Sequence, residues 1–274
     1  MAAELADSHG HLTMVFGGGE MQGEPRAPRP DELRLLVTRA RDAGVTRILV
    51  PATGRDDQRR AVEAAEAFDG VYAAVGFHPH EAKDFDEEAD LRLFEELCAS
   101  KKVVAVGEIG LDYHYDHSPR DVQKRVVAAQ LRFARSKGLP VLLHNRLSEA
   151  DLLPILEAEY PGTPEKPAGV FHSFCADVAT GERALALGYL VSFSGMLTFK
   201  SADNVREAAA ALPLASMLLE TDAPYLAPAP FRGKPNESSF LPRTAARLAE
   251  LKGVSVDEVA RATTDNFRRL FRVA

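Results

Sequence analysis

The sequence predicts an α/β fold in which eight parallel strands close into a barrel and each strand is followed by a helix. Two observations support this prediction. Short apolar runs alternate with longer amphipathic stretches from end to end of the chain. Several of the amphipathic stretches also end at a glycine, as helices often do. A regular strand–helix alternation favours parallel strands joined by right-handed crossovers, and eight such units are enough to close a barrel.

The expected strands are apolar runs rich in β-branched residues, bounded by turn-forming residues. In chain order they span residues 5–12, 46–53, 71–79, 103–112, 140–145, 169–174, 189–195 and 217–224.

The expected helices show apolar residues at helical spacing, as in Val126, Leu131 and Phe133. They span residues 31–44, 57–68, 90–101, 120–138, 148–160, 181–188 and 202–212, and a helical tail runs from about Ser238 to the end.

An open doubly wound sheet is the alternative fold, and it would carry a glycine fingerprint between its first strand and helix. The run FGGGEMQG is not followed directly by a helical pattern, so residues 17–30 are expected to form a loop. Residues 227–240 are expected to form a second long loop, after the last strand. We therefore predict a single TIM (β/α)8 barrel domain over residues 1–274, with a C-terminal helical tail.

The composition is that of a globular protein, with 46% hydrophobic and 27% charged residues. Cys98 and Cys175 form no disulfide framework, and neither a signal peptide nor an apolar run of membrane-spanning length is found. We expect a cytoplasmic protein without a membrane partner, and a monomer is favoured. The formal net charge of −7 argues against general coating of nucleic acid. A phosphate substrate stays open, because a metal ion can supply the local positive charge.

Polar residues follow the apolar runs at the positions where a barrel places its active site, the carboxyl ends of the strands. Six of the eight histidines lie there. The residues are His9, His11, His78, His80, Glu108, Asp112, Tyr113, His144, Arg146, His172, Glu220 and Asp222.

Each of these residues alone has an ordinary structural interpretation. A single strand histidine is usually a hydrogen-bonded core residue, and Asp112 is interpreted as a helix cap or turn former. His80 is interpreted as a loop residue, and His114 and His117 as surface or lid residues. The combination favours a binding site, because one set of potential ligands comes from five strands whose carboxyl ends lie at the same end of the barrel. The set is His9, His11, Glu108, His144, His172 and Asp222.

The pattern predicts metal-assisted hydrolysis. Residues two apart on a strand share a face, so His9 and His11 can reach one ion. Imidazoles with carboxylates suit a borderline or hard divalent cation, and a carboxylate such as Glu108 can bridge two ions that activate water. A Ser–His–Asp mechanism is not expected, because strand alternation directs Ser8 and Ser173 to the opposite face.

A series of motifs in this order resembles the TatD family of metal-dependent deoxyribonucleases over nearly the whole chain. The motifs are DSHGHL, GFHPH, GEIGLDYH, QLRFARSKGLPVLLHNR, FHSF, YLVSFSG, LLETDAPYLAP and RGKPNE. The resemblance implies an amidohydrolase-like TIM barrel with one or two divalent metal ions. It also implies a nuclease acting on DNA, often a 3′–5′ exonuclease, with proposed roles in DNA repair and cell death.

The resemblance also implies roles for individual residues. One metal would be held by His9, His11, Glu108 and Asp222, and a second by Glu108, His144 and His172. Glu108 and Asp222 are the expected catalytic residues, and Asp222 would take the proton of the attacking water. His78, Tyr113 and Arg146 would line the scissile phosphate, while Asn236, Lys234 and Arg232 could touch the nucleic-acid backbone. The expected metal is Mg²⁺ or Mn²⁺, with Zn²⁺ compatible with the ligand types. The expected partner is single-stranded DNA or a 3′ end.

Two other functions stay open. One is a small-molecule amidohydrolase or lactonase on the same barrel, although such enzymes often carry a carboxylated lysine where this chain has Glu108. The other is a metal-dependent nucleic-acid-binding protein without turnover, for which Asp222 and Arg146 would be unnecessary.

Overall fold

The protein is an eight-stranded parallel barrel, as the sequence predicts. The computed structural model describes residues 3–16, 21 and 24–274. Neighbouring strands pair in sequence order from the first to the eighth. The strands are β1 (Leu5–Asp7), β2 (Val45–Pro51), β3 (Val71–Val75), β4 (Val103–Asp112), β5 (Val141–Arg146), β6 (Gly169–Phe171), β7 (Tyr189–Phe193) and β8 (Met217–Leu219).

Backbone hydrogen bonds between the segments around β8 and β1 close the ring. The Ser8 amide donates to the Leu219 carbonyl at 2.9 Å, and the Asp222 amide donates to the His9 carbonyl at 2.8 Å. The His11 amide in turn donates to the Ala223 carbonyl at 2.8 Å. These bonds fix the segment carrying His9 and His11 beside the segment carrying Asp222.

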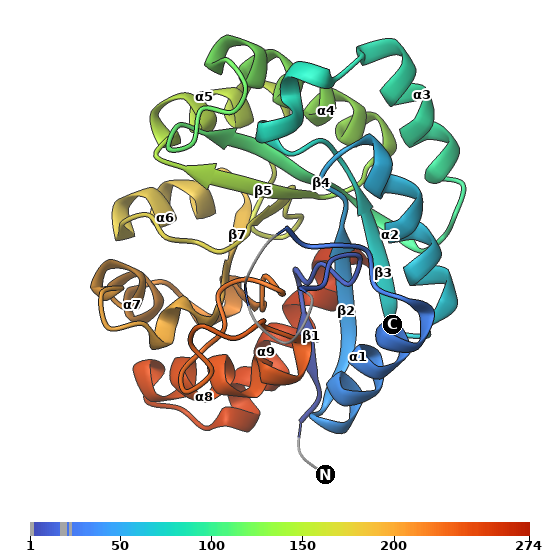
Figure 1. Ribbon diagram of the computed structural model, residues 1–274. Helices are drawn as coiled ribbons and strands as arrows, with labels where there is room; N and C mark the ends of the chain where they lie inside the picture. The colour runs from blue at the N-terminus through green and yellow to red at the C-terminus, as the bar shows by residue number, and fades with distance from the viewer. Residues whose placement is uncertain (1–2, 17–20, 22–23) are drawn as a thin grey trace.

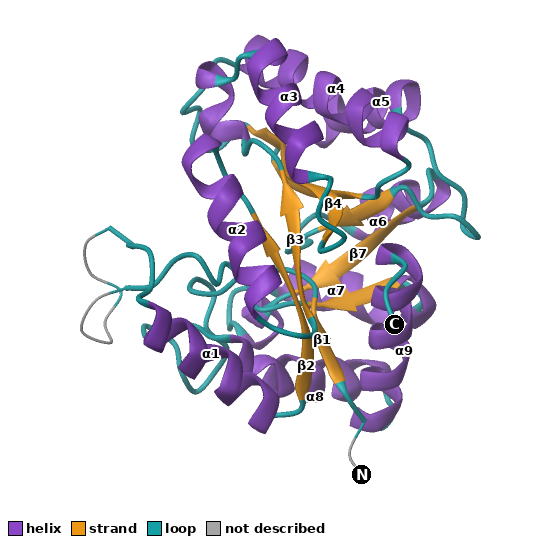
Figure 2. Ribbon diagram, turned by 90° about the vertical axis from the view of Figure 1, so that its right-hand side faces the viewer, coloured by secondary structure: helices purple, strands orange, loops and turns teal. Residues whose placement is uncertain are grey.

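Helices surround the barrel (Figures 1 and 2). They are α1 (Pro30–Asp42), α2 (Arg55–Ala67), α3 (Glu87–Leu97), α4 (Arg120–Lys137), α5 (Glu149–Glu159), α6 (Val178–Ala186), α7 (Asp203–Ala211), α8 (Leu241–Lys252) and α9 (Val256–Phe271). Short 3₁₀ helices span Pro79–Asp84, Gly195–Thr198, Leu214–Ser216 and Ser238–Phe240. None of the helices in the described ranges is long and apolar enough to cross a bilayer.

The barrel interior is filled by side chains and is not a pore. One buried apolar cluster takes side chains from all eight strands and from α9. Its strand members are Ala6, Leu49, Ala74, Val104, Ala105, Leu142, Val170, Leu190 and Leu218. Phe267, Leu270 and Phe271 of α9 pack against them, so the last helix plugs the barrel. The strands terminate in polar residues at the other end of the barrel, and the cavity described below opens there.

The predicted helical tail and the predicted glycine ends are confirmed. The tail consists of α8 and α9, separated at Gly253, which has a φ of 65°. Gly44, Gly138 and Gly188 all have positive φ values at or just after helix ends. The loop predicted for residues 17–30 falls partly on residues outside those described, and α1 begins at Pro30.

Most strands are shorter than predicted, and for three of them the difference matters for the site. β1, β6 and β8 have three residues each, whereas the sequence favours six to eight. His9, His172 and Asp222 therefore lie just beyond the strand ladders. β4 matches its predicted bounds and carries Glu108 within the strand.

The close approach of β4 to β5 gives a stability prediction. Gly110 has a φ of 149°, and a Cβ there would lie 1.9 Å from the His144 carbonyl oxygen. Gly138 also has a positive φ but has no atom within 4 Å of such a Cβ. We expect Gly110→Ala to lower the free energy of unfolding by more than about 3 kcal/mol, because the strands must separate. Gly138→Ala should cost only about 1–2 kcal/mol. Urea unfolding compares the two variants, and equal losses would contradict the strand contact.

Candidate metal centre

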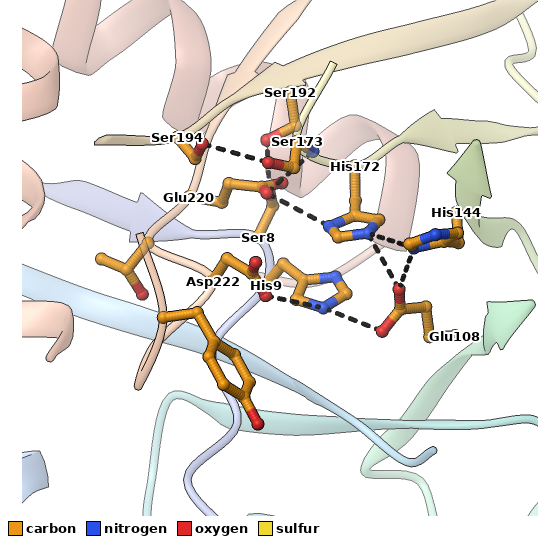
Figure 3. A network of polar contacts seen from close by, with 12 residues as sticks. Ser8, His9, Glu108, His144, His172, Ser173, Ser192, Ser194, Glu220 and Asp222 are labelled. Atoms are coloured by element: carbon orange, nitrogen blue, oxygen red, sulfur yellow. Dashed lines mark hydrogen bonds and ion pairs between the residues drawn. The ribbon is translucent and has the colours of Figure 1, made fainter. Parts of the chain in front are cut away.

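The six predicted ligands meet at the carboxyl end of the barrel. A cavity of about 670 Å³ opens there. Five of the six line its wall, and His9 lies fully buried behind them. Figure 3 shows His9, Glu108, His144, His172 and Asp222 pointing toward one another from the ends of different strands or the residues just after them.

The first cluster consists of His9, His11, Glu108 and Asp222. The His9 Nε2 atom lies 3.2 Å from His11 Nε2, 3.3 Å from Glu108 Oε2 and 3.7 Å from Asp222 Oδ1. The His11 Nε2 atom lies 3.8 Å from Glu108 Oε2 and 3.5 Å from Asp222 Oδ1. Four ligands placed tetrahedrally at about 2.1 Å from an ion are separated by roughly 3.4 Å. The distances that His9 and His11 make to each other and to the two carboxylates are close to this value, and His9, His11 and Glu108 form a group that could hold one divalent cation.

The second cluster consists of Glu108, His144 and His172. Glu108 Oε1 lies 2.9 Å from His144 Nδ1 and 2.8 Å from His172 Nε2, and these two nitrogens are 3.3 Å apart. Three protein ligands that leave coordination positions open are typical of catalytic metal sites, whereas structural sites are closed by four.

Glu108 belongs to both clusters, because each cluster contacts a different oxygen of its carboxylate. Its side chain is buried. Burial alone would raise the pKa of Glu108, but the neighbouring His172, His78 and His9 lower it well below its ordinary value. The carboxylate is therefore ionised and can bridge two cations, as the sequence predicts.

Buried carboxylates outside the two clusters fix the orientation of two imidazoles. His172 Nδ1 lies 3.3 Å from Glu220 Oε1, so Nδ1 donates to Glu220 and leaves the Nε2 lone pair for a metal. His144 Nε2 lies 3.0 Å from Asp112 Oδ2, so this ring binds through Nδ1. Carboxylate–histidine–metal arrangements of this kind orient the ligand and raise its basicity.

Asp112 contacts a candidate metal ligand, which the sequence interpretation missed. Its carboxylate is fully buried and accepts from His80 Nε2 at 2.9 Å as well as from His144. The other oxygen accepts the backbone amides of His114 and Tyr115, at 2.8 and 3.0 Å. Burial alone would raise the pKa of Asp112, but these hydrogen bonds lower it strongly. Asp112 does order a turn, as predicted, and the same side chain also positions a metal ligand.

His78 lies beside the second cluster and forms, with Glu108 and His144, a further group that could hold an ion. Its Nε2 lies 3.4 Å from Glu108 Oε1 and 3.3 Å from His144 Nδ1. Its Nδ1, however, accepts the backbone amide of His80 at 3.2 Å, so the proton of the neutral ring is on Nε2. Burial lowers the pKa of His78 to about 4, which keeps the ring neutral. The neutral His78 ring is therefore a donor through Nε2, which faces Glu108 and His144, and the residue lines the cavity.

Asp7 lies next to the first cluster and holds its backbone segments together through hydrogen bonds. Its fully buried carboxylate accepts from the Thr221 and Ser238 hydroxyls, at 2.6 and 2.7 Å, and from the His9 amide at 3.2 Å. Burial raises the pKa of Asp7 to about 6 despite these bonds. Asp7 thereby links the segments that carry His9 and Asp222.

The serines adjoining the ligands differ in part from the prediction. The Ser8 hydroxyl turns away from the cluster and lies 2.9 Å from that of Ser192. Ser173 was expected to face away from the ligands but lines the cavity, because its φ of 43° breaks the strand alternation beyond β6. The Ser173 hydroxyl contacts Ser194 at 3.1 Å, so no histidine activates it as a nucleophile.

The structure brings some predicted substrate contacts to the cavity and not others. His78 and Arg146 line it. Tyr113 points elsewhere, since its hydroxyl donates to Asp151 at 2.6 Å, and burial raises the pKa of this phenol. The Asn236 amide is consumed within its loop, where it donates to the Thr221 and Tyr225 carbonyls at 2.7 Å.

The two basic residues on the same loop also lie away from the metal cavity. The Arg232 guanidinium lies 3.5 Å from the ring centroid of Phe199, and Lys234 lines a separate cavity of about 340 Å³. That second cavity shares His11 with the metal centre.

Comparisons with known proteins agree with this geometry. The model of the "TatD related DNase" family matches residues 6–272. The chain is 41% identical to the Bacillus subtilis metal-dependent hydrolase YabD, over 98% of this chain and 99% of the relative. It is 36% identical to the Pantoea vagans 3′-5′ ssDNA/RNA exonuclease TatD, over 87% and 93% of the two chains. The crystal structure of the Escherichia coli TatD homologue YjjV superposes with a TM-score of 0.87 at 34% identity, covering both chains completely.

The Asp112–His144 pair gives a metal-binding prediction. Asp112→Asn keeps the side-chain shape but removes the charge that holds His144 Nε2. We expect affinity for Mn²⁺ at the second cluster to fall roughly 10- to 100-fold, as for other lost outer partners of metal ligands. Asp116→Asn is the matched control, because Asp116 is exposed and pairs with Arg120. Calorimetric titration with Mn²⁺ compares the variants, and unchanged affinity in Asp112→Asn would exclude a role in the centre.

Proposed function

The chain belongs to the TatD-related DNase family of metal-dependent hydrolases, and we propose that it hydrolyses phosphodiester bonds of DNA from the 3′ end of single strands. The observation that carries the proposal is Glu108, whose two oxygens face two separate ligand clusters. Paired cation sites sharing a carboxylate suit phosphoryl hydrolysis, since both the attacking and the leaving oxygen need stabilisation. The exonuclease named among the relatives supports the polarity and the choice of substrate.

The ligand set defines which ions are compatible. His9, His11, Glu108 and Asp222 would hold one ion, and Glu108, His144 and His172 the other. Bound divalent ions supply a nucleophilic water near neutral pH and offset charge on the phosphate oxygens. Mg²⁺ or Mn²⁺ is the proposed ion in use, and the imidazole-rich set also accommodates Zn²⁺.

Asp222 is the proposed proton acceptor. Burial would raise the pKa of Asp222, but its bond to His11 and the charges of His172 and His9 lower it. The carboxylate is therefore ionised at neutral pH. It lines the cavity on the side of the first cluster, so it would be placed to accept the proton of an attacking water.

Arg146 and His78 are the proposed phosphate contacts. The planar guanidinium of Arg146 can hold two phosphate oxygens at once. The neutral His78 ring presents its Nε2 proton to the cavity. Together these two groups would orient the phosphate over the shared carboxylate while adding only one positive charge.

Loss of a ligand should abolish hydrolysis without unfolding the protein. We expect Glu108→Ala and His144→Ala to lower the rate by more than about 100-fold, because even outer partners of metal ligands contribute 10–100-fold. Glu81→Ala is the matched control, since Glu81 is an exposed carboxylate on the cavity wall outside both clusters. The assay uses end-labelled single-stranded DNA, RNA and a panel of carboxylic esters, each with Mg²⁺, Mn²⁺ or Zn²⁺. Circular dichroism checks the fold of each variant.

Two results would overturn the proposal. Full activity of Glu108→Ala would remove the shared carboxylate from the mechanism. Ester hydrolysis without cleavage of any oligonucleotide would instead favour a small-molecule hydrolase on this barrel.

A further inference from the structure

A row of planar side chains stands at the rim of the cavity, with Tyr115 and His117 on the loop after β4 and Arg146 at the end of β5. Tyr115 lines the cavity, yet its residue is 51% exposed. The Arg146 guanidinium carbon lies 4.8 Å from the Tyr115 ring centroid. The His117 ring is nearly parallel to the Tyr115 ring, with an interplanar angle of 8° and centroids 5.7 Å apart.

An exposed aromatic ring beside a binding cavity requires an explanation. Most large apolar side chains in this protein are buried, and Tyr115 is one of few large hydrophobic side chains exposed in the described ranges. Tyr113 has a similar place in the sequence but is committed elsewhere, because its hydroxyl bonds Asp151 and its ring packs under Arg120. Tyr115 is therefore the tyrosine of this loop that can meet a ligand in the cavity.

The position of Tyr115 is fixed relative to the metal ligands. Its backbone amide donates to Asp112 Oδ1 at 3.0 Å, and Asp112 Oδ2 bonds His144 Nε2 at 3.0 Å. A single buried carboxylate therefore anchors both the rim loop and a ligand of the second cluster. A group stacked on Tyr115 would be held in constant register with a phosphate at the centre.

We infer that Tyr115, with Arg146 and His117, forms a stacking platform for an unpaired nucleobase next to the scissile phosphate. The inference rests on the proposed function and adds the group that recognises a single strand. Bases of every kind have a flat π-face, so aromatic stacking binds single strands with little sequence preference. Stacking uses the face of the Arg146 guanidinium and leaves its N–H edge free for the phosphate.

A base in a duplex cannot use this platform until it is unpaired and unstacked from its neighbours. The platform therefore selects single strands, frayed ends and overhangs over paired ends. DNA and RNA bases share the required chemistry, so the platform by itself does not discriminate between them.

The test measures hydrolysis of a single-stranded oligonucleotide by wild type, Tyr115→Ala and Tyr115→Phe. We expect Tyr115→Ala to raise KM roughly 5- to 150-fold, the range for one lost base stack. Tyr115→Phe keeps the ring and should restore KM. Asp116→Asn is the matched control, because Asp116 is an exposed neighbour on the same loop that pairs with Arg120 and does not line the cavity.

A second set of substrates separates stacking from a structural role of the loop. An oligonucleotide with an abasic residue at either position flanking the scissile bond removes the base instead of the tyrosine. If Tyr115 stacks on that base, the difference between wild type and Tyr115→Ala largely disappears with one of the two abasic substrates. A blunt duplex of the same sequence should also show a smaller difference, and DNA and RNA versions should behave alike.

The outcomes separate this inference from the proposed function. If wild type cleaves oligonucleotides and Tyr115→Ala cleaves them with unchanged KM, the platform is overturned and the nuclease function stands. The same holds if the loss in Tyr115→Ala is equally large on both abasic substrates. If wild type cleaves no oligonucleotide with any metal, both are overturned.

Discussion

The burial of one ionised carboxylate, Glu108, is the constraint on which the rest of this site depends. A charge removed from water at the centre of a barrel costs several kcal/mol unless it is paired and hydrogen-bonded. Here the partners are imidazoles from four other strand ends. Because each oxygen of Glu108 faces a different group of imidazoles, the carboxylate can be stabilised on both sides by cations, and the barrel must bring both groups within a few ångströms.

The imidazoles carry a second constraint, since a histidine offers a lone pair from one nitrogen only when its proton is on the other. Glu220 and Asp112 direct the lone pairs of His172 and His144 toward Glu108. The backbone amide of His80 instead leaves His78 with its proton on the side of Glu108. Three rings of the same chemistry, all near Glu108, thus receive different roles from what lies behind them. The centre is defined as much by these outer hydrogen bonds as by the ligands themselves.

The sequence was sufficient for the fold and for the set of residues that converge. Parallel strands have their carboxyl ends at one edge, so polar residues ending the strands had to meet, and the six expected ligands do.

Strand periodicity could not predict the direction of side chains beyond the strand ends. β6 and β8 end early, and the backbone then takes positive φ values at Ser173 and Asp222, so Ser173 faces the cavity against the alternation rule. The side chains behind the ligands were also missed, because a carboxylate that orders a turn, such as Asp112, has the same local sequence whether or not a histidine bonds it. Likewise, Tyr113 and Tyr115 cannot be ranked until the path of their loop is known.

The proposed cation sites explain how an acidic chain could bind the anionic substrate proposed for it. Glu108, Asp112 and Asp222 line the cavity with carboxylates, and the net charge of the chain is −7. A phosphodiester would be repelled from such a site unless cations occupied it. Metal and phosphate binding are then thermodynamically linked, and each must raise the affinity for the other by the same factor. His78, as a neutral donor, and Arg146, stacked by its face on Tyr115, are suited to such a site. They would orient the phosphate without competing with the metal ions for the carboxylates.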